Sequence, residues 1–233
     1  MLKNLLFSII FFTGIITISI IFLPALILPK NVILFGGKLM GYWAGLCLRL
    51  ILSVQIKVLG RENIISDKKF FIACSHQSMF ETFYLQTIFN SPIFILKKEL
   101  LQIPVFGWYL KKIGSIAIKR NKVTKENLGF FDDIKNTINN TKRPVIIFPQ
   151  GTRVKPEERP PFKKGVARIY EELKISCQPI AINSGYVWPK KGFKTPFKQI
   201  TISILPSINY GTDKNVFIFD LEKIIYNELN RIN

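Results

Sequence analysis

The sequence of 233 residues contains one histidine, His76, and three cysteines, Cys47, Cys74 and Cys177. An odd number of cysteines in mostly apolar surroundings does not indicate a disulfide framework, so we expect the body of the protein in a reducing cytoplasm. Zinc-finger spacing, a glycine-rich phosphate loop and an aromatic RNA-binding signature are missing from the sequence. Internal repeats are missing too, and the length suits one domain with a sizeable core.

Acidic residues are scarce, with 15 against 33 basic residues and a formal net charge of +18 at pH 7. This excess predicts an anionic partner: phospholipid headgroups, a phosphorylated substrate, an acidic carrier protein or nucleic acid. Only 8 of the basic residues are arginine, and lysine suits a diffuse attractive field better than bidentate reading of bases. A lysine-rich genome composition is the alternative source for part of the excess.

Charge is absent from Leu5 to Leu28, a run of mostly Leu, Ile and Phe that exceeds the roughly 20 residues needed to cross a bilayer. A signal peptide, the alternative, has a shorter apolar region and a small-residue cleavage site, which this run does not supply. A second apolar segment, Val32 to Val54, contains Lys38 and Arg49. Eleven residues is close to three helical turns, so both cations share one face, as in a helix at a membrane interface.

Pro24 and Pro29 separate the two apolar segments, and the second carries glycines at four-residue spacing, Gly37, Gly41 and Gly45. Such a stripe of small residues allows two membrane helices to approach closely. We therefore predict a proline-hinged pair in which the second helix packs on the first through this stripe. Residues 1–54 are assigned to membrane-anchoring helices and residues 55–233 to a separate domain.

From residue 55 onward, short apolar runs alternate with amphipathic stretches, which predicts an α/β domain with a mainly parallel mixed sheet flanked by helices. The segment between residue 96 and Gly114 is rich in turn residues, and no helix or strand is predicted in it. Predicted strands are 55–59, 69–74, 92–96, 115–118, 145–148, 178–182 and 199–205, and predicted helices are 79–89, 123–138, 165–173 and 215–231.

The segment Cys74 to Glu81 lies at a predicted strand-to-helix turn and holds the single histidine. Histidine can take and return a proton near neutral pH because its unperturbed pKa is about 6.5. Glu81 could orient the His76 ring. The alternative is structural, because Ser78 and Glu81 also fit a capping box, in which both side chains satisfy amides at the helix end.

Two later stretches carry groups suited to anions or membranes. Trp108 and Tyr109 stand among lysines, a pattern of membrane interfaces, although a solvated helix with buried aromatics gives the same pattern. The predicted strand at 145–148 ends in a Pro-Gly turn, where an α/β sheet opens to ligands. Gly151 permits close backbone approach there, and the Arg153 guanidinium can bind a phosphate with two hydrogen bonds. A plain solvated turn is the alternative.

With these residues taken together, the chain resembles the lysophosphatidate acyltransferase (1-acylglycerol-3-phosphate O-acyltransferase) family of the glycerolipid acyltransferase superfamily. Four blocks occur in the family's order and span residues 76 to 179. They are the His-x4-acid motif at His76 and Glu81, the Lys-x-Glu-Leu block from Lys97 to Arg120, the Phe-Pro-Gln-Gly-Thr-Arg block from Phe148 to Arg153, and the strand with Pro179.

Two positions depart from the family pattern. The family's usual aspartate is Glu81 here, one methylene longer, and the family's usual glutamate in the third block is Gln150. A hydrogen-bonding role survives the second change, but a role that needs a carboxylate does not.

The resemblance implies a membrane-bound enzyme of phospholipid biosynthesis that transfers a fatty acyl group to the sn-2 hydroxyl of 1-acylglycerol 3-phosphate, giving phosphatidic acid. The acyl donor is a thioester of coenzyme A or acyl carrier protein, and no metal or further cofactor is expected. His76 is the expected general base, with Glu81 fixing its tautomer. The residues expected to bind the substrate phosphate are Lys97, Arg120, Gly151, Thr152 and Arg153.

The expected location is the cell (inner) membrane, with the catalytic domain on the cytoplasmic face and in contact with an anionic membrane surface. Alternatives within the superfamily are acceptors such as glycerol 3-phosphate, lysophosphatidylglycerol or a lyso-aminolipid. An acyl-cysteine intermediate on Cys74 is a further alternative, disfavoured because a buried cysteine in an apolar strand is usually inert. A remote alternative is a membrane-tethered nucleic-acid-binding protein, although no nucleic acid is expected as a partner.

Overall fold

A computed structural model describes residues 1–118, 129–141, 143–196 and 198–233. The chain begins with two long helices, α1 (Leu2–Ile21) and α2 (Lys30–Leu52), joined by a short 3-10 turn, η1 (Leu23–Leu26). Pro24 lies inside that turn, and Pro29 caps the start of α2, where its missing amide hydrogen costs nothing. The predicted proline-hinged helical pair is therefore present.

Seven strands form one sheet in the order β1-β7-β6-β2-β5-β3-β4. Every pair of neighbours is parallel except β6 and β7, which are antiparallel. The predicted mainly parallel mixed sheet is confirmed. The strands are β1 (Gln55–Leu59), β2 (Phe70–Cys74), β3 (Ile93–Lys97), β4 (Ile116–Ile118), β5 (Val145–Ile147), β6 (Ser176–Ile182) and β7 (Gln199–Ile204).

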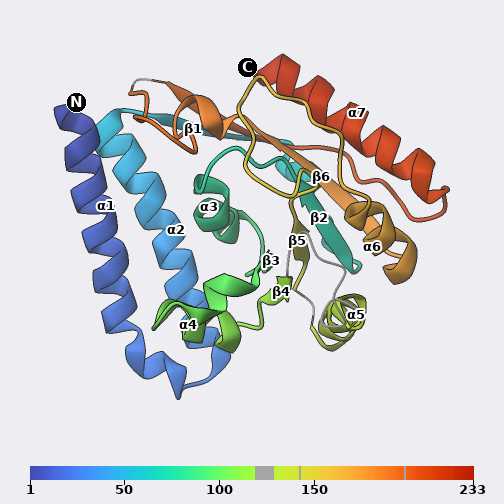
Figure 1. Cartoon of the computed structure of the whole chain (residues 1–233), viewed down its shortest axis with the longest axis horizontal. Helices are drawn as coiled ribbons and strands as arrows, with labels where there is room; N and C mark the ends of the chain where they lie inside the picture. Colours follow the sequence, from blue (N-terminus) through green and yellow to red (C-terminus); the bar gives the residue numbers. More distant parts are fainter. Residues whose placement is uncertain (119–128, 142, 197) are drawn as a thin grey trace.

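Helices cover both faces of the sheet, as Figure 1 shows. Alternation along the central strand β2 directs Ile72 and Cys74 into the core beneath the N-terminal helices, and Phe71 and Ala73 into the core on the opposite face. The first core is completed by α1, α2 and α3 (Phe80–Ile88), and the second by α5 (Phe130–Asn140), α6 (Gly165–Leu173) and α7 (Lys214–Ile232). Both faces of β2 are thus buried, which makes its carboxyl end a fixed platform.

The predicted glycine stripe on α2 does not face α1. An added Cβ at Gly41 would lie 2.5 Å from the backbone oxygen of Phe83, and one at Gly45 would lie 2.8 Å from the Tyr84 ring, so the stripe packs on α3. Contact between α1 and α2 uses another glycine, Gly14 on α1, against which the Trp43 indole lies. The prediction was wrong about the partner because small-residue spacing marks a close approach without saying which helix approaches.

Helix α1 also packs on the domain that follows. Asn4 exchanges two hydrogen bonds with the backbone of Lys194, and the rings of Phe7 and Phe11 each lie 5.1 Å from the Trp188 ring. The opposite side of α1 exposes large apolar residues: Leu5, Leu6, Ile9, Phe12, Ile16 and Ile20. Helices α1 and α2 are both long and apolar enough to cross a membrane, and these exposed side chains suit association with one.

The segment predicted to be rich in turns contains two short helices, η3 (Lys98–Gln102) and α4 (Phe106–Lys112). Gly107, read as a turn residue, instead allows α4 to approach η3, because an added Cβ there would lie 2.2 Å from the Leu101 oxygen. On α4, Trp108 is exposed, whereas Tyr109 turns inward and donates a hydrogen bond to the Ser19 oxygen at 2.5 Å. The start of the helix predicted at 123–138 lies outside the described residues.

Candidate active site

The predicted strand-to-helix turn is present between β2 and α3. Strand β2 ends at Cys74, and α3 begins at Phe80. Because β2 pairs in parallel with β5 on one side and β6 on the other, the segments that leave these three strands lie at the same edge of the sheet. The turn after β2, the 148–154 segment after β5 and the 183–185 turn after β6 meet there.

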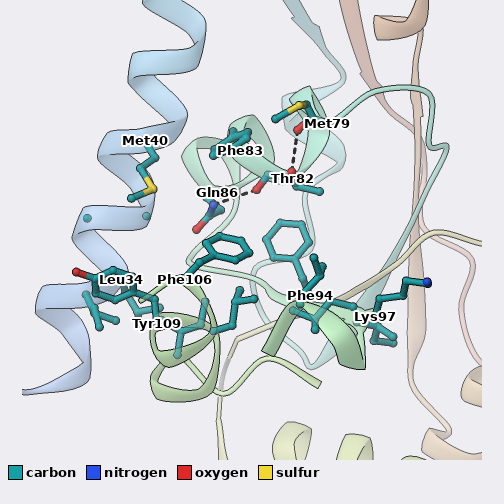
Figure 2. Close-up of a pocket in the computed structure, with 18 of the residues that line it drawn as sticks. Leu34, Met40, Met79, Thr82, Phe83, Gln86, Phe94, Lys97, Phe106 and Tyr109 are labelled. Carbon is teal, nitrogen blue, oxygen red and sulfur yellow. Dashed lines mark hydrogen bonds between the residues drawn. The ribbon is translucent and has the colours of Figure 1, made fainter. Parts of the chain in front are cut away.

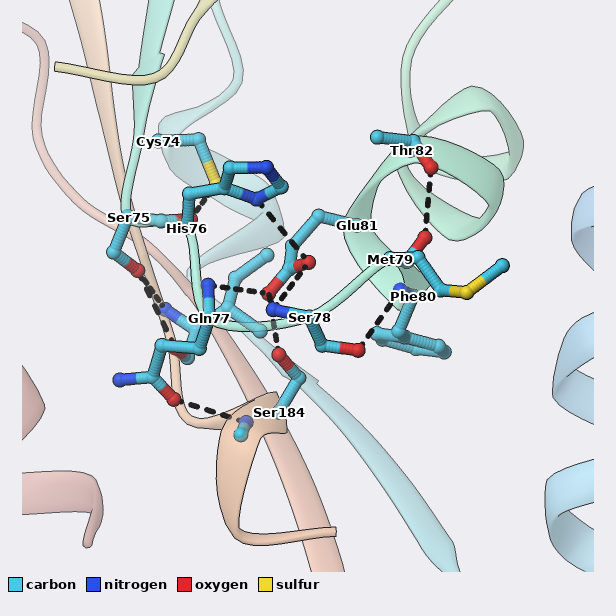
Figure 3. A network of polar contacts seen from close by, with 12 residues as sticks. Cys74, Ser75, His76, Gln77, Ser78, Met79, Phe80, Glu81, Thr82 and Ser184 are labelled. Carbon is cyan, nitrogen blue, oxygen red and sulfur yellow. Dashed lines mark hydrogen bonds and ion pairs between the residues drawn. The ribbon is translucent and has the colours of Figure 1, made fainter. Parts of the chain in front are cut away.

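The structure brings His76 and Glu81 together (Figure 3). Nδ1 of His76 lies 3.5 Å from Oε2 of Glu81, whose side chain is fully buried. This distance exceeds that of a strong hydrogen bond, but such contacts often tighten only when substrate binds. The His76 ring stacks on Phe148 with 3.9 Å between ring centroids and is 12% exposed, so it remains accessible to a ligand.

Glu81 also serves the start of its own helix. Its carboxylate accepts hydrogen bonds from the backbone amides of Gln77 and Ser78, while the Ser78 hydroxyl accepts one from the Phe80 amide. A further hydrogen bond comes from the Ser184 hydroxyl to Oε1 of Glu81. The carboxylate therefore satisfies amides at the helix start, as the structural alternative predicts, while its Oε2 also faces Nδ1 of His76.

The third sequence block holds the backbone of His76. Its amide donates to Oε1 of Gln150 at 2.7 Å, and its carbonyl oxygen accepts from the Val154 amide at 3.0 Å. An amide oxygen accepts the His76 bond as a carboxylate oxygen could, which explains how Gln150 replaces the family's usual glutamate here. The Gln150 amide also lies beside Tyr226 of α7, where it opposes the burial that raises the pKa of Tyr226 to about 12.

A pocket of about 500 Å³ has His76 among its lining residues. Figure 2 shows part of its wall, with Leu34, Phe94 and Phe106 labelled. Its walls come from α2, α3, β3, η3 and α4, together with Phe22 at the end of α1, and most of its side chains are apolar. Lys97 and Arg153 line it together with His76 and Phe148. The apolar lining residues include Phe22, Ile33, Leu34, Met40, Met79, Phe83, Phe94, Leu100, Phe106, Leu110 and Ile113.

The residues predicted to bind phosphate are only partly assembled. Lys97 lies 3.5 Å from Glu99 and is half exposed, and Arg153 is partly buried at the pocket wall. Gly151 has a φ of +72°, the left-handed conformation that glycine adopts without strain, and turns the chain between Phe148 and Arg153. Thr152 is exposed and lies 3.5 Å from the Lys190 ammonium, outside the pocket. Arg120 lies outside the described residues.

Cys74, two residues before His76, is fully buried. Burial, reinforced by the charge of Glu81, raises the pKa of its thiol well above the usual value, so the thiolate needed for acyl transfer is suppressed. Within the ranges that the structure describes, no group of three or more His, Cys, Asp or Glu side chains is placed to bind a metal.

Two side chains of the site have no role in the sequence-based prediction: Phe148 beneath the His76 ring and Ser184 on Glu81. Gln150 was predicted to keep a hydrogen-bonding role, and the structure shows its partner, the backbone amide of His76. Phe148 and Gln150 belong to the third block, which marks their importance without showing what they contact. Ser184 follows the strand with Pro179, and no spacing in the sequence connects it with residue 81.

Known proteins similar to this chain are acyltransferases. The model of the family described as Acyltransferase matches residues 55–183. The chain is 33% identical over 163 residues to the 1-acyl-sn-glycerol-3-phosphate acyltransferase of Pseudomonas aeruginosa, covering 69% of this chain and 62% of that protein. The match to the Saccharomyces cerevisiae protein of that name, at 31% identity, covers 62% of this chain and 49% of its relative.

The protein of the same name from Bacillus subtilis is 34% identical, over 69% of this chain and 83% of its relative. The crystal structure of the 1-acyl-sn-glycerophosphate acyltransferase of Thermotoga maritima has a similar fold. Its TM-score is 0.80 at 20% identity, covering 100% of this chain and 98% of that one.

Proposed function

Because this chain belongs to the acyltransferase family, we propose that it is a 1-acylglycerol-3-phosphate O-acyltransferase. It transfers a fatty acyl group from a thioester to the sn-2 hydroxyl of 1-acylglycerol 3-phosphate and yields phosphatidic acid for phospholipid biosynthesis. The observation that carries the proposal is the His76–Glu81 pair at the wall of an apolar pocket that also contains Lys97 and Arg153.

His76 acts as the general base. With Glu81 facing Nδ1, the ring keeps a proton on that atom and leaves Nε2 free to accept the proton of the attacking hydroxyl. The hydroxyl oxygen then bonds to the thioester carbonyl carbon, the carbon–sulfur bond breaks, and the departing sulfur takes the proton from His76 as a thiol. Glu81 stabilises the imidazolium that forms between these steps.

Lys97 and Arg153 bind the acceptor's phosphate, because both line the pocket that contains His76. Lysine supplies a point charge, and the arginine fork binds two phosphate oxygens together. The Gly151 and Thr152 backbone and Arg120 complete this phosphate site in the proposal. No metal is required, because a thioester is already an activated acyl group.

The apolar part of the pocket holds an acyl chain. Its walls include Phe22 at the end of α1 and Leu34 and Met40 of α2, so the chain-binding space adjoins helices long and apolar enough to cross a membrane. This arrangement suits an enzyme of the cell (inner) membrane, with the catalytic domain on the cytoplasmic face and an anionic bilayer surface as partner. A lipid acceptor and a two-tailed product could then enter and leave without crossing water.

The same mechanism would also acylate the hydroxyl of other acceptors, among them glycerol 3-phosphate, lysophosphatidylglycerol and lyso-aminolipids. The nucleic-acid alternative has no support among the relatives, whose names describe acyl transfer.

The test uses purified protein in lipid, with lysophosphatidate as acceptor and acyl thioesters of coenzyme A and of acyl carrier protein over a series of chain lengths. Formation of phosphatidate with either donor is the expected result, and the chain-length series shows which chains the pocket accepts. Parallel reactions with the other acceptors are the control. Transfer to one of them, with none to lysophosphatidate, would contradict the proposal.

A further inference from the structure

Ser184 joins the 183–185 turn to the carboxylate of Glu81. We propose that Ser184 is a positioning residue for acyl transfer, one that holds Oε1 of Glu81 so that Oε2 faces Nδ1 of His76. The inference rests on the proposed function, because it assigns a role in the same reaction. It adds a side chain from the end of β6 to a site otherwise formed by the segments after β2 and β5.

The contacts of the carboxylate favour this role over simple packing. Oε1 accepts from the Gln77 amide at 3.2 Å, from the Ser78 amide at 3.1 Å and from the Ser184 hydroxyl, whereas Oε2 shares the Ser78 amide and faces the histidine. Ser184 and Glu81 are both fully buried. Ser184 is thus the only side chain seen to donate to this carboxylate within the described part of the chain.

The length of Glu81 explains why such a donor is needed. Glutamate has one more methylene than the aspartate usual at this position in the family, and hence one more rotatable bond between backbone and carboxylate. The two backbone amides lie beside the start of α3 and fix the carboxylate from one direction. Ser184 approaches from another element, so the added bond cannot rotate without breaking a buried hydrogen bond.

Ser184 is itself held in place by the turn that contains it. The Asn183 side chain donates to the Ile232 oxygen and accepts from the Thr201 amide, both at 2.7 Å, which ties the turn to α7 and β7. The Gly185 amide donates to Oε1 of Gln77 at 3.0 Å, and an added Cβ at Gly185 would lie 2.9 Å from the Cβ of Gln77. The turn therefore forms hydrogen bonds with both ends of the Gln77–Glu81 segment (Figure 3).

The first test needs no substrate, because His76 is the only histidine and its ring gives the only histidine signals in an NMR spectrum. Isotope-labelled histidine, observed at mildly alkaline pH where imidazole is neutral, reports which ring nitrogen carries the proton. Wild-type protein should show the proton on Nδ1. Ser184→Ala should increase the fraction of molecules with the proton on Nε2. Ser184→Thr, which keeps a hydroxyl, should restore the wild-type ratio of the two tautomers.

The matched control is Ser176→Ala, which removes a buried serine from the other end of β6, where its hydroxyl donates to Asn209. This change should leave the tautomer ratio as in the wild type. If Ser184→Ala folds, as judged by circular dichroism, and its tautomer ratio also equals the wild-type ratio, the positioning role is wrong. Because this readout involves no acyl transfer, it stands even if the proposed acceptor is incorrect.

The second test is kinetic. Ser184→Ala should lower kcat about tenfold, with little change in KM for either substrate, because the carboxylate loses its orientation while the pocket is unaltered. In a Glu81→Asp background the same substitution should cost much less, since a shorter carboxylate no longer reaches Ser184. Equal losses in both backgrounds would overturn the inference, whereas a wild-type protein with no turnover on lysophosphatidate would instead contradict the proposed function.

Discussion

Two groups of residues lie beside the same pocket. One is the turn that carries His76 and Glu81, and the other is the pair of cations, Lys97 and Arg153. The surrounding protein fixes the two groups to different degrees. Glu81 is fully buried and His76 is 12% exposed, with hydrogen bonds to their backbone and side-chain atoms from three segments. Lys97 is 52% exposed and forms a salt bridge with the exposed Glu99. Proton transfer depends on distance and orientation, whereas a phosphate is attracted by charge over a wider range of positions. Burial and hydrogen bonds are therefore concentrated at the turn, where proton transfer needs a fixed geometry.

The largest expected effect is on the rigid side. His76→Ala should lower kcat about 10²- to 10⁴-fold, because that is the usual contribution of a positioned proton acceptor. Turnover is measured in lipid with saturating lysophosphatidate and thioester. Circular dichroism serves as the control for folding. Retained turnover would show that the turn has only a structural role, and the contrast between a catalytic turn and phosphate-binding cations would then be wrong.

A smaller effect, and a different one, is expected at the cations of the pocket. Arg153→Ala should raise KM for lysophosphatidate about 10- to 100-fold, the loss expected for a charge-assisted hydrogen bond, and change kcat less. The matched control is Lys155→Ala, two residues away, because Lys155 is 80% exposed and lies 3.9 Å from Glu158. An unchanged KM for the acceptor in the Arg153 variant would contradict the phosphate-binding role.

The support beneath the rigid turn can be tested through α2. Gly41→Ala should destabilise the protein by about 1–3 kcal/mol, because the new Cβ would lie 2.5 Å from the Phe83 oxygen on α3, the helix that carries Glu81. Thermal unfolding and turnover are measured together. Gly165→Ala on α6 is the control, since no described atom beyond its chain neighbours and the backbone of its own helix lies within 4 Å of its added Cβ. An increase in Tm for the Gly41 variant would show that α2 and α3 are not tightly packed there.

The smallest effect is expected at Cys74. Because burial raises the pKa of its thiol, the thiol stays protonated at neutral pH and becomes reactive only as pH rises above its usual range. Thiol-alkylating reagents at neutral pH should therefore leave turnover unchanged, and Cys74→Ala should retain most of the activity. Mass spectrometry under turnover conditions checks for acylation. An acyl group on Cys74 would revive the covalent route.

Several helices and strands could be predicted from the sequence, and one helix could not. Helix α6 begins and ends as predicted, and six of the seven strands lie within about one residue of their predicted bounds, because each has a short apolar run between turn residues. Helix α4 was missed because Gly107 and Pro104 read as turn residues, although Gly107 serves a close contact between two short helices. The pairing of His76 with Glu81 was predictable because four residues of chain connect them.

Contacts between distant segments were not predictable in the same way. The stripe on α2 gave no sign that α3 would be its partner, and nothing near Ser184 pointed to Glu81, 103 residues before it. A local pattern records what a segment needs, such as a small side chain or an apolar face. Which other segment meets that need depends on strand order.

The sequence by itself determined the α/β class, the two apolar helices, the single histidine with its acid, and the blocks that mark the family. Only the tertiary structure decided that β5 and β6 flank β2, and so brought Gln150, Phe148 and Ser184 around the histidine turn. The physical reason is that neighbouring parallel strands end at one edge of the sheet, where residues far apart in the chain become adjacent.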